Sequence, residues 1–110
     1  MNLTPRVAAV HDMSGLGRCS LTVALPVLSA MGAQCCPLPT AVLSAHTAFP
    51  ASHLATFLDL TDEMERMLLH WRKLHVSFDA IYSGFLGSAG QIGLIEDFYR
   101  CLLYTSDAAD

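Results

Sequence analysis

The stretch Val7-Ala8-Ala9-Val10-His11-Asp12-Met13-Ser14-Gly15-Leu16-Gly17 decides the fold, because an apolar run changes directly into a polar, glycine-rich turn. The run Val7–Val10 is continuous rather than alternating, which is typical of a strand buried on both faces of a parallel sheet. A helix is expected next, from about Arg18 to Met31, with Gly32 as its terminator. A buried strand, a tight turn and a helix form the first unit of an α/β fold.

A second unit follows, with a less regular strand. Thr40–Leu43 is its most strand-like part, and Pro37 and Pro39 predict that the preceding residues are irregular or lie at a sheet edge, since proline cannot donate to a ladder. The stretch Ser44–Phe57 has no clear period and is expected to be a long loop. The helix of this unit comes after that loop.

This second helix is expected to begin near Thr61, whose hydroxyl would cap it, and to end near Leu74. A third strand is expected at Ala80–Tyr82, and Ser88 and Gln91 predict a capping box for a third helix. The apolar stripe of the second helix is Met64, Met67, Leu68 and Trp71. The order strand-helix-strand-helix-strand-helix predicts a parallel sheet with right-handed crossovers.

Composition is that of a chain that buries most of itself. Of 110 residues, 53% are hydrophobic and 15% are charged, and a net charge of −4 with six Lys and Arg gives no footprint for nucleic acid. A membrane span is not expected, because prolines and polar residues interrupt the uncharged stretch 19–58. Without a secretory leader, the cysteines are expected to be reduced thiols of a cytoplasmic protein; they are Cys19, Cys35, Cys36 and Cys101.

Three polar segments, 11–17, 44–47 and 83–85, follow the three expected strands. Because ligands of open parallel sheets bind at the carboxyl ends of the strands, these segments predict a small-molecule site. A dinucleotide fingerprint would need glycine where Ser20 stands, and an acidic residue about 20 residues further on, yet none occurs between Asp12 and Asp59. The flanks of Ser14 do not fit a nucleophile elbow, and no His or Cys pair has metal-ligand spacing.

Several blocks in order resemble bacterial pyridoxal kinases of the ribokinase-like superfamily, over about residues 5–100. The blocks are His11-Asp12-Met13-Ser14-Gly15-Leu16-Gly17-Arg18-Cys19-Ser20-Leu21-Thr22, Cys35-Cys36-Pro37-Leu38-Pro39-Thr40-Ala41-Val42-Leu43-Ser44, His46-Thr47, Asp59-Leu60-Thr61-Asp62-Glu63-Met64 and Phe78-Asp79-Ala80-Ile81-Tyr82-Ser83-Gly84-Phe85-Leu86-Gly87-Ser88. The resemblance implies a partial three-layer ribokinase-like α/β fold. It also implies ATP-dependent phosphorylation of the 5′-hydroxymethyl group of pyridoxal, pyridoxine or pyridoxamine.

The resemblance also assigns substrate-binding residues by position. Ser14, with neighbouring Asp12, matches the turn that contacts ring substituents, Thr47 follows the histidine that lines the ring, and Phe85 matches an aromatic residue that stacks on it. The implied substrate-binding set is Asp12, Ser14, His46, Thr47, Gly84 and Phe85. The family continues His-Thr with glycines, whereas Ala48-Phe49-Pro50 stands here, which changes the backbone freedom of that loop.

The family's G-x-G-D segment, with its catalytic aspartate and nucleotide loops, has no counterpart in this chain. ATP and Mg²⁺ are therefore expected to serve a full-length enzyme, with no catalytic residue, metal site or complete cofactor site here, and the chain alone is expected to be inactive. Residues 1–100 are interpreted as the N-terminal part of the kinase domain, and 101–110 as a non-native tail that leaves the helical pattern. The partner is a pyridoxal-type small molecule, and a homodimer is expected at full length.

Three alternatives remain open from the sequence. The Asp12-Met13-Ser14-Gly15 turn fits a hydroxymethylpyrimidine kinase of the same superfamily as well as a pyridoxal kinase. A dinucleotide-binding module of an oxidoreductase is disfavoured by the missing acidic residue. A non-enzymatic remnant is the third alternative.

Overall fold

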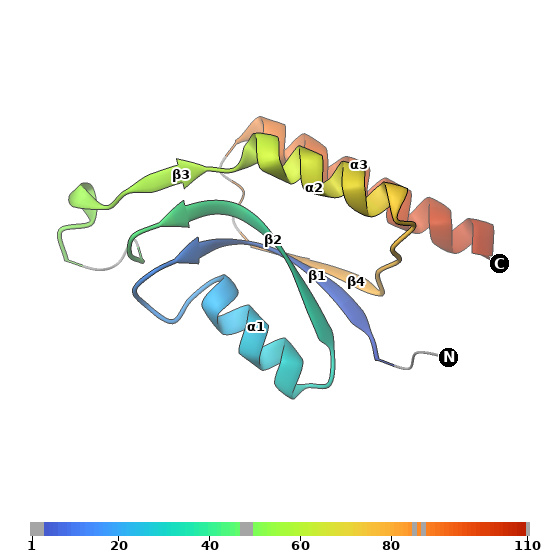
Figure 1. Cartoon of the computed structure of the whole chain (residues 1–110), viewed down its shortest axis with the longest axis horizontal. Coiled ribbons are helices and arrows are strands. Elements are labelled where there is room, and N and C mark those ends of the chain that lie inside the picture. Colours follow the sequence, from blue (N-terminus) through green and yellow to red (C-terminus); the bar gives the residue numbers. More distant parts are fainter. Residues whose placement is uncertain (1–3, 47–49, 85, 87, 110) are drawn as a thin grey trace.

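The structure is a computed structural model of the whole chain and describes residues 4–46, 50–84, 86 and 88–109. A curved sheet lies between two layers of helix, with α1 on one face and α2 and α3 on the other (Figure 1). The expected three-layer α/β architecture is therefore confirmed. The elements are β1 (Arg6–Ser14), α1 (Leu21–Ala30), β2 (Gln34–Leu43), the 3-10 helix η1 (Ser52–Leu54), β3 (Phe57–Asp59), α2 (Thr61–Lys73), β4 (Ala80–Ser83) and α3 (Ala89–Ala109).

The sheet has the strand order β3-β2-β1-β4 and is mixed rather than wholly parallel. Strand β1 pairs in parallel with β2 and with β4, as the alternating strand-helix pattern predicted. Strand β3 pairs antiparallel with β2, so the expectation of a wholly parallel sheet was wrong at this edge. The expected loop 44–57 accordingly ends in a strand, β3, which has only three residues and is therefore too short to show a period in the sequence.

Strand β2 is longer than its sequence suggested. It runs through Pro37 and Pro39, which pair in register with Ala9 and His11. Because β3 pairs only with Ala41–Leu43, both prolines lie in the part of β2 that forms an edge of the described sheet. The prediction that these residues are irregular or lie at a sheet edge is confirmed by its second alternative.

Helix α1 ends as the sequence predicted. Gly32 has a positive φ of 88°, and the Ala33 N–H donates to the Leu28 carbonyl at 3.0 Å, which closes the last turn. Met31, expected as the last helical residue, lies instead at the carboxyl cap and is 75% exposed.

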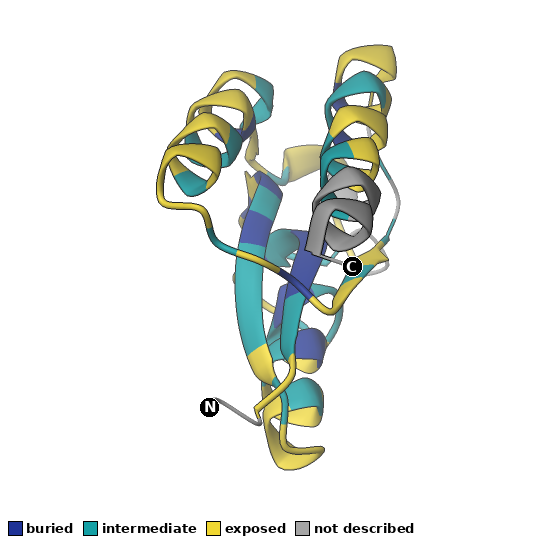
Figure 2. Cartoon of the chain, turned by 90° about the vertical axis from the view of Figure 1, so that its right-hand side faces the viewer, coloured by how far each residue is buried: buried dark blue, intermediate teal, exposed yellow. Residues whose placement is uncertain are grey.

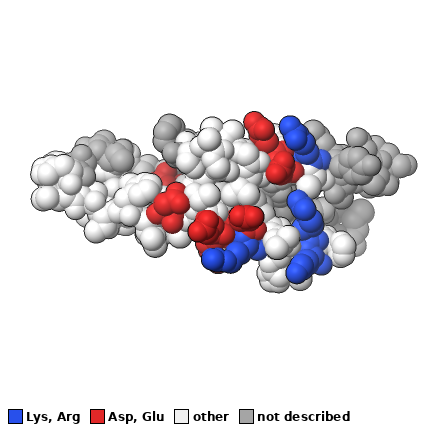
Figure 3. Space-filling view, turned by 90° about the horizontal axis from the view of Figure 1, so that it is seen from above, with Lys and Arg blue, Asp and Glu red and all other residues white. Residues whose placement is uncertain are grey.

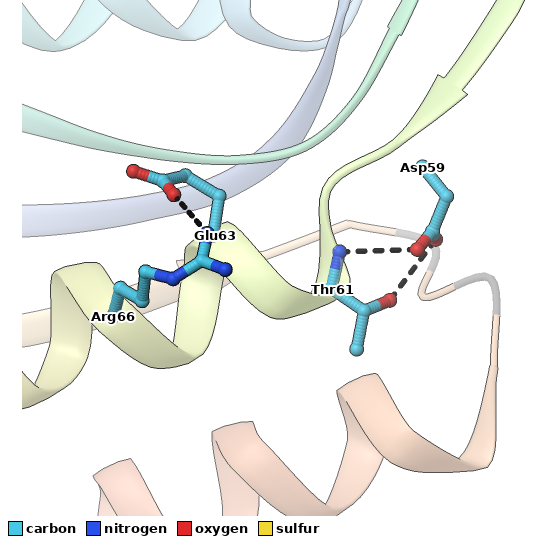
Figure 4. A network of polar contacts seen from close by, with 4 residues as sticks. All are labelled: Asp59, Thr61, Glu63 and Arg66. Atoms are coloured by element: carbon cyan, nitrogen blue, oxygen red, sulfur yellow. Dashed lines mark hydrogen bonds and ion pairs between the residues drawn. The ribbon is translucent and has the colours of Figure 1, made fainter.

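The start of α2 differs from the expected Thr61 cap. The Asp59 carboxylate accepts from the Thr61 backbone N–H at 3.1 Å and from the Thr61 hydroxyl at 3.0 Å (Figure 4). Asp59, just upstream, therefore satisfies the first amide, and Thr61 is the first helical residue. Figure 4 also shows the exposed ion pair between Glu63 and Arg66, at 2.8 Å, a type of pair that contributes little stability in water.

The core lies on both faces of β1. Ala9 packs with Leu21 and Ala24 of α1, whereas Val10 packs on the opposite face with Met64 of α2. The buried residues gather on the central strands and on the helix faces turned toward them (Figure 2). The expected apolar stripe of α2 is confirmed, since Met67, Leu68 and Trp71 all pack against the cluster that contains Val10 and Met64.

Helix α3 continues to Ala109, so the expectation that residues 101–110 leave the helical pattern was wrong for 101–109. A helix that has already formed extends at the cost of fixing one residue for each new hydrogen bond. Leucine and alanine, which recur in this stretch, are among the strongest helix formers. Among the described residues, no helix has the length and apolar character needed to cross a membrane.

Met64 is fully buried between α2 and the sheet, so its side chain is expected to contribute strongly to the stability of the fold. Met64→Ala should lower the free energy of unfolding by about 2–5 kcal/mol, since it removes apolar contacts and leaves a cavity. Urea denaturation followed by circular dichroism measures this. The matched control is Leu69→Ala on the same helix, where Leu69 is 51% exposed. Equal effects of the two substitutions would contradict the packing described.

Candidate functional site at the carboxyl ends of the strands

The three parallel strands end on one rim of the sheet. Their following loops are tied together by backbone hydrogen bonds: the Gly15 N–H donates to the Leu43 carbonyl at 2.9 Å, and the His46 N–H donates to the Leu16 carbonyl at 2.8 Å. A Cβ at Gly15 would lie 2.8 Å from the Ser44 carbonyl oxygen, so only glycine allows this close approach. The loops after β1 and β2 therefore form one continuous surface.

A hollow of about 570 Å³ opens at this rim, on the α2–α3 side of β1. Its volume is suited to a small ligand with one ring. Polar side chains converge on it from several elements. The lining residues are Asp12, Ser14, Cys19, Ser20, Thr40, Ala41, Leu43, His46, Phe57, Asp59 and Gln91.

Asp12 is the centre of the polar contacts in the hollow. Its carboxylate accepts from the Ser14 hydroxyl at 3.1 Å and from the Ser20 hydroxyl at 2.8 Å. Ser14 is 2% exposed, so its hydroxyl is held in place by packing as well as by this bond. Two hydroxyls and a carboxylate form a compact group that accepts and donates hydrogen bonds to a polar ring substituent.

Ser20 occupies the amino-terminal cap of α1 but does not cap it. Its φ is 54°, a left-handed conformation that non-glycine residues rarely adopt. Its hydroxyl turns to Asp12, and the Cys19 N–H is instead satisfied by the Thr22 hydroxyl at 3.0 Å. Backbone strain of this kind is concentrated at functional sites.

His11 lies on the opposite side of β1, toward α1. It is 8% exposed, its ring centroid lies 4.6 Å from that of Tyr82, and its Nε2 is buried without a hydrogen-bond partner. Burial lowers the pKa of the imidazole, with the Asp12 charge opposing that shift, so the neutral form is favoured. A Cβ at Gly84 would overlap the His11 ring, and this contact requires glycine there.

A second hollow, also of about 570 Å³, lies beside His11 and Gly84 against α1. Asp12 and Ser20 line both hollows, so these two residues form the wall between them. A third hollow of about 370 Å³ lies between α2 and α3. Trp71, Phe78 and Phe98, whose ring centroids lie 5.3–6.3 Å apart, line that groove, which lies away from the strand ends.

Of the six residues expected to bind substrate, the structure brings Asp12, Ser14 and His46 to the same hollow. Gly84 lines the neighbouring hollow instead. Thr47 and Phe85 lie outside the described residues.

Ser20, Thr40, Asp59 and Gln91 line the site but were absent from the expected set. Asp59 could not be placed because β3 was not predicted, and Gln91 was interpreted only as a partner in a helix cap. That cap is half present, since the Ser88 hydroxyl accepts from the Gln91 backbone N–H at 3.3 Å. The side-chain Nε2 of Gln91 reaches Thr40 and Asp59 instead.

The residues of the hollow do not fit the phosphates of ATP or a magnesium ion. No Lys or Arg lines it, and in the part of the chain that the structure describes no three His, Cys, Asp or Glu side chains are grouped to hold a metal. On the face seen in Figure 3, the end of the molecule that carries β3 and η1 shows few charged side chains, and most of those in view lie over α2 and α3. The site is thus suited to a polar ring rather than to a polyphosphate.

Solved structures similar to this chain are kinases. A candidate phosphomethylpyrimidine kinase from Bacteroides thetaiotaomicron VPI-5482 is 56% identical, with a TM-score of 0.86 over 92% of this chain and 34% of that one. A second crystal form of that protein contains pyridoxal and matches with a TM-score of 0.84 over 90% of this chain and 34% of that one.

Two further matches are pyridoxal kinases by description. The enzyme from Lactobacillus plantarum is 30% identical, with a TM-score of 0.81 over 90% of this chain and 34% of that one. The enzyme from Trypanosoma brucei, at 16% identity, a TM-score of 0.84 and coverage of 99% and 39%, supports the fold alone. No protein-family model matches the sequence, and no curated protein does so either.

The sheet, with helices on both faces and loops gathered at one rim, has an α/β fold of the ribokinase-like type. Within it, the chain is similar to a candidate phosphomethylpyrimidine kinase and to a pyridoxal kinase, at 56% and 30% identity. It spans about a third of the length of the structures that it matches.

The close packing of Gly84 against the His11 ring can be tested directly by substitution. Gly84→Ala should lower the free energy of unfolding by about 1–3 kcal/mol, because the new methyl group forces the buried imidazole aside. The matched control is Gly93→Ala within α3, where nothing lies near the added atom and alanine should stabilise the helix. Thermal denaturation of both variants measures the difference. A tolerated Gly84→Ala would contradict the packing of β4 against His11.

Proposed function

We propose that this chain forms the acceptor-binding part of an ATP-dependent kinase, which phosphorylates the 5′-hydroxymethyl group of pyridoxal, pyridoxine or pyridoxamine. The observation that carries the proposal is the convergence of Asp12, Ser14 and His46 on one hollow at the carboxyl ends of the strands. The presence of pyridoxal in a crystal form of a 56% identical protein supports it.

The chemistry of the hollow suits a substituted pyridine. The Asp12 carboxylate would accept a hydrogen bond from the ring hydroxyl or from a protonated ring nitrogen, and the Ser14 hydroxyl would bind a neighbouring substituent. Apolar atoms of Leu43 and Phe57 would cover the ring. Thr47, Gly84 and Phe85 remain part of the proposed substrate-binding set.

Phosphoryl transfer depends on positioning and on neutralising charge. ATP and Mg²⁺ supply the phosphoryl group and its charge compensation in such a kinase, and the described residues of this chain do not provide a site for them. We therefore propose that residues 1–100 are the N-terminal part of a kinase domain, and that its catalytic and nucleotide-binding segments lie elsewhere in a longer protein. We also propose that this protein is cytoplasmic and homodimeric. Residues 101–110 are proposed to be a non-native tail.

A hydroxymethylpyrimidine is the second candidate substrate, because the 56% identical protein is described as a candidate phosphomethylpyrimidine kinase. Both substrates are small aromatic rings with a primary alcohol, so the hollow accommodates the chemistry of either. The two are distinguished by their ring substituents.

The proposal is tested with the product of the full reading frame and with the 110-residue chain. The full product should phosphorylate pyridoxal with ATP, at a higher kcat/KM than hydroxymethylpyrimidine, whereas the short chain should show no turnover. Ser14→Ala in the full product should raise KM for pyridoxal about tenfold, the effect of losing one well-placed hydrogen bond, and leave KM for ATP unchanged. A coupled assay of ADP release measures all of these rates.

The control is Ser29→Ala on the exposed face of α1, which should change neither KM. Turnover by the short chain, or a Ser14→Ala enzyme with an unaltered KM for pyridoxal, would contradict the proposal. A preference for hydroxymethylpyrimidine would assign the second candidate substrate.

A further inference from the structure

The register of the sheet changes at the candidate site. His11 pairs with Pro39, but Met13 pairs with Val42, so β2 places two residues, Thr40 and Ala41, where β1 places only Asp12. An extra residue of this kind is a β-bulge, which bends the strand and re-aims nearby side chains. The bulge in β2 therefore lies directly opposite Asp12.

Thr40, in this bulge, is bonded to elements other than β1. It is 3% exposed, and its carbonyl oxygen accepts from the Leu60 N–H at 3.0 Å and from the Gln91 Nε2 at 3.0 Å. The first bond comes from the junction of β3 and α2, and the second comes from the first turn of α3. Two elements distant in sequence thus hold the bulge in one conformation.

The Gln91 side chain is the buried centre of this arrangement. The residue is 1% exposed, and its Nε2 also lies 3.2 Å from Asp59 Oδ1 and 3.1 Å from Thr61 Oγ1. The Thr61 hydroxyl in turn donates to Asp59 Oδ1, as Figure 4 shows. One amide therefore connects β2, β3, α2 and α3 at the wall of the hollow.

We propose that Gln91 is a positioning residue of the acceptor site, which sets the width and orientation of the hollow by holding the Thr40 bulge and Asp59 in place. The inference rests on the proposed function. Gln91, Thr40 and Asp59 all line the hollow with Asp12 and Ser14. Asp59 Oδ1 receives two donors and its Oδ2 receives the Thr61 N–H, so hydrogen bonds on both oxygens hold this carboxylate in place.

The proposed role of Gln91 concerns binding of the acceptor substrate and not binding of ATP. Loss of the Gln91 amide frees the bulge opposite Asp12, so the hydroxyl and carboxylate that meet the ring lose their relative position. Small misplacements of this kind weaken productive binding strongly. The residues of the hollow do not fit a nucleotide, so binding of ATP should not respond.

The first test uses Gln91→Met in the full-length kinase, a change that keeps the length of the side chain and removes its donor. KM for pyridoxal should rise about tenfold, while KM for ATP stays within about twofold. Steady-state assays with each substrate varied in turn measure both constants. The wild-type enzyme, assayed in parallel with pyridoxal and with hydroxymethylpyrimidine, tests the proposed function separately.

Ser88→Ala is the matched control, because it removes the hydroxyl that caps α3 and leaves the Gln91 amide intact. It should lower Tm without changing either KM. A Gln91→Met enzyme that loses Tm but keeps its KM for pyridoxal would show that Gln91 is only structural, and would overturn the inference. A wild-type enzyme inactive on both alcohols would overturn the proposed function and the inference with it.

A second variant covers the case in which Gln91→Met does not fold. In Gln91→Glu, the introduced carboxyl has the same shape, and its burial beside Asp59 raises its pKa. Its charged form repels the Thr40 carbonyl, whereas its protonated form restores one donor. KM for pyridoxal should therefore be raised at neutral pH and should fall toward the wild-type value as the pH is lowered. A pH profile parallel to that of the wild type would contradict the positioning role.

Discussion

Strand β1 lies between two parallel neighbours with helices on both faces, and this double burial constrains the rest of the molecule. Ala8, Ala9 and Val10 are completely buried, so the position of β1 relative to its neighbouring strands is fixed. Because β2 and β4 run parallel to it, their carboxyl ends reach the same rim. Backbone hydrogen bonds join the loops after β1 and β2 there, and Asp12, Ser14 and His46 line one hollow.

The side chains that line that hollow suit a polar ring better than a phosphate group. Its described lining residues supply hydroxyls, an amide and two carboxylates, which suit a polar ring, and include no Lys or Arg for phosphate. Its polar groups are largely bonded to one another: Asp12 holds Ser14 and Ser20, and Asp59 holds Thr61. Such internal satisfaction pre-organises a site, since the groups need little rearrangement when a ligand arrives. The hollow therefore has the features of a site for a polar ring, which is what the proposed acceptor-binding role requires.

Much of this arrangement could be predicted from the sequence, because local patterns determine it. The buried run before Asp12 and the glycine turn after it predicted β1, and the short apolar run ending near Gly84 predicted β4. The antiparallel β3 could not be predicted, since its three exposed residues gain their conformation from pairing with β2. Gln91 was interpreted through its local cap, whereas its amide bonds Thr40, 51 positions earlier, a contact that only the folded chain creates.

The proposed acceptor site lies at the strand ends, on the α2–α3 side of β1. A crystal structure of the full-length protein with pyridoxal tests it most directly. The pyridine ring should lie in the hollow between β1 and β3, with a ring substituent within hydrogen-bond distance of Ser14 or Asp12. A ring bound in the groove between α2 and α3, or against α1 beside His11, would contradict it.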